Sequence, residues 1–172
     1  MRLIARFRPS RSLLPMCLVL VVCSAAAQVQ ESALKAAFIY NFAIFTSWPD
    51  HAAAGPFIVC VDAGTPLAES LRQLEGKRVD DRRWKVKETA DDPRKTGRCS
   101  IAVIQSTATQ QTNGPVATTL VVSDGGVSGK NGAVITLVNE GDRVKFDIDL
   151  MQAERTGVKF SAKLLQLARN VI

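Results

Sequence analysis

The sequence predicts a single small α/β domain in which a mixed β-sheet carries helices on its faces. Two observations support this prediction. Short continuous apolar runs at 57–61, 100–104 and 119–122 are typical of strands that are buried on both faces. Helical periodicity at 66–74 and again at 159–170 places helices between and after these runs.

Residues 1–27 have the pattern of a secretory signal peptide. Four arginines and no acid precede the apolar run 13–22, and the small residues 24–27 follow it. The run is shorter than the roughly 20 apolar residues that a bilayer span needs. We therefore expect cleavage after Ala27, export to the periplasm, and a mature domain formed by residues 28–172.

The segment 31–48 predicts a first helix, which Pro49 ends. One stripe of this helix appears at 3.6-residue spacing, and its members are Leu34, Phe38, Asn41, Phe45 and Trp48. Ile39 and Phe42 lie off this stripe and widen the apolar surface of the helix. We expect them on the exposed side, where they bind a partner protein together with Tyr40 and the neighbouring carboxyl-terminal segment. Full burial under the last helix is the alternative.

The middle of the chain alternates strands and helices. After the buried run 57–61, Thr65-Pro66 opens a helix whose inner side chains end before Gly76. The alternation at 84–87 predicts a half-exposed strand, and the polar stretch 106–113 predicts a short helix.

The last third of the chain predicts a loop, a hairpin and a helix. Four glycines at 123–132 indicate a surface loop. The strands 133–139 and 143–148 flank a three-residue connection that contains Gly141, which is typical of a hairpin. Helical spacing at 159–170 then predicts a terminal helix.

The charge of the mature domain does not indicate nucleic-acid binding. The whole chain has 22 basic and 16 acidic side chains, but four of the basic ones lie in the leader. The mature part is left with a net charge of +2, so its basic character is mostly a property of the leader. We expect no nucleic acid as a partner.

Groups that could support catalysis do not converge in the sequence. His51 is the only histidine and has no metal-ligand spacing around it. Asp147 and Asp149 could act as paired carboxylates, but we expect them on the solvated face of the hairpin. The segment 125–130 is one residue short of a phosphate loop, and Asn131 replaces the required Ser or Thr. The chain is therefore predicted not to be an enzyme and to need no metal or cofactor.

Two cysteines, Cys60 and Cys99, remain in the mature part. In an oxidising compartment such a pair is expected to form a disulfide.

Several segments resemble the YfiR-like periplasmic proteins: 33–42, 45–49, 57–61, 76–79, 144–150 and 157–159. In this resemblance Cys60 and Cys99 match the strand cysteines of the family. It implies a regulator that binds the periplasmic domain of an inner-membrane diguanylate cyclase and represses it, which restrains cyclic-di-GMP signalling and biofilm formation. A sensor kinase in the membrane, or a second copy of this chain, are further candidate partners.

The alternative hypothesis is a periplasmic small-molecule-binding module that acts on a sensor kinase. Its ligand cleft would lie at the carboxyl ends of the strands that contain Cys60 and Ile104. The two hypotheses predict different surfaces. A partner-binding protein should expose an apolar patch, whereas a ligand-binding protein should enclose a pocket with a few convergent polar groups.

Overall fold

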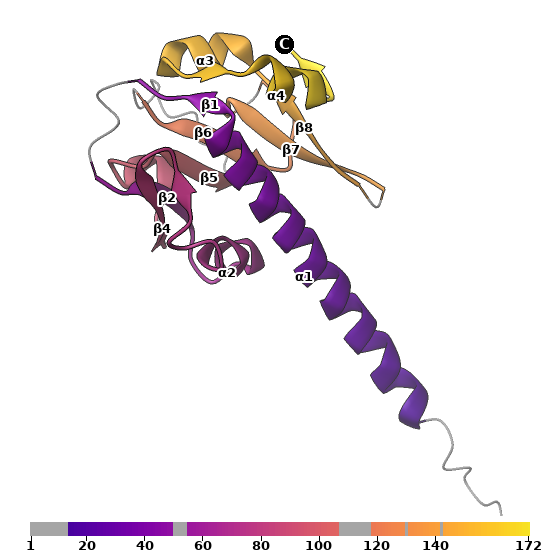
Figure 1. The fold of residues 1–172 in the computed structure, drawn as a ribbon. Helices are drawn as coiled ribbons and strands as arrows, with labels where there is room; N and C mark the ends of the chain where they lie inside the picture. The colour runs from indigo at the N-terminus through magenta and orange to yellow at the C-terminus, as the bar shows by residue number, and fades with distance from the viewer. Residues whose placement is uncertain (1–13, 50–54, 107–117, 130, 142) are drawn as a thin grey trace, which may run out of the picture.

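A mixed sheet of eight strands is the centre of the structure (Figure 1), a computed structural model that describes residues 14–49, 55–106, 118–129, 131–141 and 143–172. The strand order is β10-β8-β7-β6-β5-β2-β4-β3. The five strands from β4 to β7 are parallel. β8 is antiparallel to β7, β3 is antiparallel to β4, and β10 runs parallel to β8. The bounds are β2 (Phe57–Asp62), β3 (Arg78–Val79), β4 (Arg82–Thr89), β5 (Ile101–Gln105), β6 (Leu120–Asp124), β7 (Ile135–Glu140), β8 (Arg143–Ile148) and β10 (Asn170–Val171).

This architecture confirms the predicted fold class. The three apolar runs form the adjacent parallel strands β2, β5 and β6, and β7 and β8 form the predicted hairpin. The strand predicted at 84–87 is the centre of β4. His51, Lys130 and most of the helix predicted at 106–113 lie outside the described residues.

One face of the sheet carries the main hydrophobic core. Alternate side chains of the strands, such as Val59, Ile101 and Leu120, point to the same face and are buried there. The carboxyl-terminal half of α1 (Leu14–Ile44) covers this face together with α2 (Pro66–Arg72) (Figure 1).

Helix α1 ends four residues before Trp48, which was predicted as its last residue. Three groups satisfy carbonyls of its last turns: the Phe45 N–H donates to Asn41, the Thr46 hydroxyl to Phe42, and the Trp48 indole N–H to Ala43. The chain then continues as β1 (Thr46–Ser47), which pairs with β9 (Lys159–Phe160). This pairing joins the end of α1 to the carboxyl-terminal segment.

The amino-terminal half of α1 extends away from the sheet (Figure 1). Gln28 and Gln30 are exposed, and Ser32 is the first buried residue of α1 among those whose side chains the structure describes. The helix therefore contributes to the domain only from about that residue onward.

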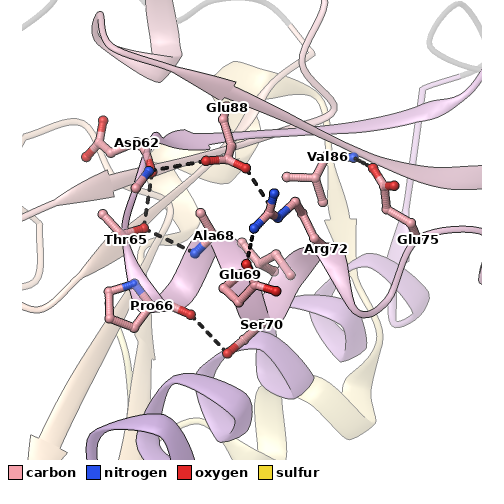
Figure 2. Close-up of polar contacts among 12 residues, drawn as sticks. Asp62, Thr65, Pro66, Ala68, Glu69, Ser70, Arg72, Glu75, Val86 and Glu88 are labelled. Carbon is pink, nitrogen blue, oxygen red and sulfur yellow. Dashed lines mark hydrogen bonds and ion pairs between the residues drawn. The ribbon is translucent and has the colours of Figure 1, made fainter. Parts of the chain in front are cut away.

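Helix α2 begins with a complete amino-terminal cap (Figure 2). The Thr65 hydroxyl accepts from the Ala68 N–H at 3.1 Å and donates to the Asp62 carbonyl, and Pro66 occupies the first turn. Glu88 on β4 contacts both ends of this helix. It accepts from the N–H of Gly64, just before the helix, and pairs with Arg72, the last helical residue. These contacts fix α2 against the carboxyl ends of β2 and β4.

The carboxyl-terminal segment differs from the single helix predicted at 159–170. It consists of α3 (Leu150–Thr156), β9, the short helix α4 (Ala162–Leu167) and β10. Ser161 caps α4 by accepting from the Leu164 N–H, so the helix begins later than predicted. It ends at Leu167 because the Arg169 N–H donates to the Phe146 carbonyl and turns the chain onto β8.

Candidate partner-binding surface

The expectation that Ile39 and Phe42 lie on the exposed side of the first helix is wrong. Both side chains are 0% exposed and pack in the main core, where the Phe42 ring lies 4.8 Å from that of Phe146. Of the stripe expected to face inward, Leu34 and Asn41 are exposed, whereas its three aromatic members are partly buried against the core: Phe38, Phe45 and Trp48. Ala36 and Ala43 belong to the buried face, and their small side chains allow α1 to approach the sheet closely.

Tyr40 lies at the border of the core. Its ring packs edge-on against Trp84, its hydroxyl donates to the Arg78 carbonyl at 2.8 Å, and the Lys77 ammonium lies 5.4 Å from its ring centroid. These contacts join α1 to the β3 side of the sheet. Partner binding by Ile39, Tyr40 and Phe42 stays a prediction, and for the two buried residues it would require the domain to open.

Exposed apolar side chains gather instead where α3, α4 and β10 lie together, at one end of the molecule (Figure 1). Met151 is 66% exposed and Leu167 is 62% exposed. The Leu150 N–H donates to the Ile172 carbonyl at 2.7 Å, which places the start of α3 beside the last strand. We call the set the carboxyl-terminal apolar surface; its members are Leu150, Met151, Leu167, Val171 and Ile172.

A polar network beneath this surface holds the last strand. Asp147 on β8 is 2% exposed, and both of its carboxylate oxygens accept from Arg169, at 2.8 and 2.6 Å. The Asn170 amide and the Ser128 hydroxyl also donate to this carboxylate. The hydrogen bonds from Arg169 lower the pKa of Asp147 despite its burial. The same bonds raise the pKa of Arg169, whose remaining nitrogen donates to Glu140.

Asp147 and Asp149 therefore do not form the solvated face that the hairpin pattern predicted. Asp149 is also buried, and its carboxylate accepts from the Gln152 N–H as the cap of α3. Both carboxylates have structural partners, so the pair is not arranged as two free acids.

The predicted disulfide is present. Cys60 on β2 and Cys99, just before β5, are bonded, with their Cα atoms 5.8 Å apart. Both residues are buried. The bond joins the two neighbouring strands on the face opposite α1.

A second polar network attaches α1 to the sheet. The buried Lys35 ammonium lies 2.7 Å from a carboxylate oxygen of Asp124 and 2.6 Å from one of Glu31. Burial opposes its charge, but the hydrogen bonds to both acids outweigh that cost and raise the pKa of Lys35. Glu31 also accepts from Asn139 on β7, and the bonds from Lys35 and Asn139 lower its pKa.

A groove of about 370 Å³ lies between α1 and the β7–β8 hairpin. It is lined by Gln30, Glu31, Leu34, Asn139, Gly141, Arg143 and Val144. This is not the place where the ligand hypothesis put a cleft, at the carboxyl ends of the strands with Cys60 and Ile104. Its acid, Glu31, is already paired with Lys35.

Within the described ranges, no group of three or more His, Cys, Asp or Glu side chains is placed to hold a metal ion. In the same part of the chain, no helix combines the length and the apolar character needed to cross a membrane.

Asp62, at the end of β2, has a pKa that is shifted in the opposite direction to that of Asp147. Burial, and secondarily the charge of Asp92, raise the pKa of Asp62.

Sequence reasoning missed Arg169, Met151 and Leu167 as functional candidates. The signal for α3 was present, because Asp149 followed three residues later by Gln152 matches a capping box. The partnership of Arg169 with Asp147 has no local signal, since 22 residues separate them.

A model of the DUF4154 family, described as YfiR/HmsC-like, matches residues 32–169. The match begins where α1 first becomes buried and ends at Arg169. No curated protein matches the chain.

Proposed function

We propose that this chain, which belongs to the YfiR/HmsC-like family, is a periplasmic regulator that binds and represses a membrane-bound diguanylate cyclase. The proposal includes cleavage of the leader after Ala27, export of residues 28–172, and an effect on cyclic-di-GMP signalling and biofilm formation. Its first support is the family match over most of the mature chain.

The carboxyl-terminal apolar surface is the observation that supports the binding role. Large apolar side chains on adjacent elements at one end of a small domain are typical of sites for protein partners. Met151 and Leu167 do not pack in the core, so conserving the fold does not explain their apolar character. Ile44, the last residue of α1, is also exposed. It lies near the carboxyl-terminal segment, because the carbonyl of the next residue, Phe45, accepts from the Ser161 N–H.

The experiment compares two apolar-to-acidic changes in cells that lack the wild-type gene. Met151→Asp changes the carboxyl-terminal apolar surface, and Leu34→Asp is the matched control, because Leu34 is an exposed apolar residue on the groove side of α1. We expect deletion to raise cyclic-di-GMP, Leu34→Asp to restore the wild-type level, and Met151→Asp to leave it high although the protein is folded and exported.

Two results would contradict the proposal. If deletion leaves the cyclic-di-GMP level unchanged, the protein does not repress a diguanylate cyclase. If a folded Met151→Asp protein represses fully, the carboxyl-terminal apolar surface is not the binding site.

A further inference from the structure

The two edges of the sheet differ in how their backbone groups are used. At the β3 end of the sheet, β3 pairs only with the first two residues of β4, and beyond it the Gly76 N–H donates to the Trp84 carbonyl and the Trp84 N–H to the Lys77 carbonyl, at 3.1 and 2.8 Å. Farther along, the Val86 N–H donates to the Glu75 carboxylate at 3.0 Å (Figure 2). A turn and an acidic side chain thus occupy positions where another strand would pair.

At the opposite edge, no strand of the described residues pairs with the outer side of β10. The Ile172 N–H donates to the Ile148 carbonyl at 2.9 Å, and the Ile172 carbonyl accepts from the Leu150 N–H. Successive residues of a strand direct their N–H and C=O groups to opposite sides. The N–H and C=O of Val171 therefore point away from β8, toward the outside of the sheet.

Side chains at the two edges differ in the same sense. Arg83, Lys85 and Lys87 are exposed along β4, and such charges discourage a further strand. At the β10 edge, Val171 and Ile172 are 43% and 52% exposed. The cation before them, Arg169, is held by Asp147 and Glu140.

The net charge of the carboxyl-terminal segment that carries this edge indicates the kind of partner. Between residues 150 and 172 the chain exposes Arg155, Lys159 and Lys163, and its single acid in that range is Glu154. A second copy of the chain would bring the same cations to the contact, which is unfavourable. An acidic segment with apolar side chains fits both the charge and the carboxyl-terminal apolar surface.

We propose that the membrane partner adds an extended, acid-bearing segment as a strand at the β10 edge. The segment pairs with the outward N–H and C=O of Val171, and its apolar side chains pack on Leu150, Met151 and Ile172. This mode is β-strand addition, in which the backbone supplies affinity and the flanking side chains supply specificity. The inference rests on the proposed function, since it assumes a membrane partner.

The test uses the exported protein and the full-length cyclase in detergent, with binding measured by titration. Val171→Pro removes the outward N–H, whereas Val171→Ala shortens the side chain and keeps that N–H. We expect Val171→Pro to weaken binding at least about tenfold and Val171→Ala to weaken it less than about threefold. A variant in which the amide before Val171 is replaced by an ester lacks this N–H and keeps the Val171 side chain, so it decides the matter if the proline variant does not fold.

The outcomes separate the two proposals. If the wild-type protein does not bind the cyclase, the proposed function fails before the edge is tested. If the wild type binds and the ester variant binds equally well, strand addition is wrong and the proposed function stands. A loss from Val171→Ala as large as that from Val171→Pro, with binding by the ester variant unchanged, would also overturn strand addition, because side-chain contact would then explain the binding. Sedimentation of the wild type as a dimer that the ester variant converts to a monomer would identify a second copy as the occupant and overturn the inference.

Discussion

The guanidinium of Arg169 donates to both carboxylate oxygens of Asp147, at 2.8 and 2.6 Å, and joins the approach to β10 to the inner side of β8. Bidentate pairs of this kind fix orientation as well as distance. Because Asp147 is buried and Arg169 is partly exposed, the acid is the member whose isolation is costly. The pair therefore determines where the carboxyl-terminal apolar surface lies.

Asp147→Asn should destabilise the domain by about 2 kcal/mol, since it removes a charge-assisted pair from a buried site. It should also loosen β10, so the Ile172 amide, which donates to Ile148, should exchange with solvent faster. Urea denaturation and amide exchange measure these effects. Glu140→Gln is the control, because it removes the exposed partner of the same arginine. Equal effects of the two changes would show that burial of Asp147 does not matter.

Ile39→Asp should unfold the mature domain, at a cost above about 4 kcal/mol, because it places a charge in the main core. Asn41→Asp lies two residues away on the exposed side of the same helix and should change the stability little. Thermal melts followed by circular dichroism compare the two. A cooperative melt of Ile39→Asp near the wild-type temperature would contradict the burial of this face.

The sheet could be predicted from the sequence because buried parallel strands leave a local pattern. Continuous apolar runs identified β2, β5 and β6, and the Gly-containing connection identified the hairpin. The Cys60–Cys99 bond was predicted from the expected export and from the two cysteines that lie outside the expected leader.

The buried face of α1 could not be predicted in the same way. Apolar residues occur on most sides of this helix, so the 3.6-residue period fits two stripes. The sheet selects the stripe with Ile39 and Phe42, whose ring packs on Phe146 more than a hundred positions later. Such a choice depends on tertiary contact and leaves no local signal.

The sequence indicated the carboxyl-terminal segment as a binding region, but the residues that form its apolar surface could not be predicted, for a similar reason. The spacing of Phe160, Leu164 and Leu167 suggested one helix with one buried side, but only Leu164 is fully buried. β10 exists because β8 offers an edge, and two residues are too few for a strand to be recognised in the sequence.

Cys99→Ser should lower the stability of the mature protein by up to about 4 kcal/mol without preventing folding. The bond closes a chain separation of 39 residues, so its loss frees a long loop in the unfolded state. The melting temperature of the wild type should fall to that of the variant when dithiothreitol is added, and the variant should not respond. Two free thiols in the denatured, non-reduced wild type would show that the bond does not form.

Asp62→Asn should stabilise the domain at pH 7, in contrast to Asp147→Asn. Burial raises the pKa of Asp62, so the folded state holds its proton more strongly than the unfolded state does. The charged form therefore costs stability at neutral pH, and that cost disappears as the pH falls below about 4, the ordinary value for Asp. The gain at pH 7 should be on the order of 0.5 kcal/mol, because Asp62 is only partly buried.

Urea denaturation of the wild type and both variants between pH 7 and pH 3 checks the two signs together. The advantage of Asp62→Asn should shrink toward zero on acidification. The pKa of Asp147 is lowered, so its stabilising effect is complete above about pH 4 and is lost as the pH falls through its value in the folded state. The free energy of unfolding that Asp147→Asn loses relative to the wild type should therefore also shrink toward zero, whereas for Asp62→Asn it is a gain that shrinks. If Asp62→Asn is less stable than the wild type at pH 7, the carboxylate of Asp62 has a favourable partner, and the assignment of burial as the cause of its raised pKa is wrong.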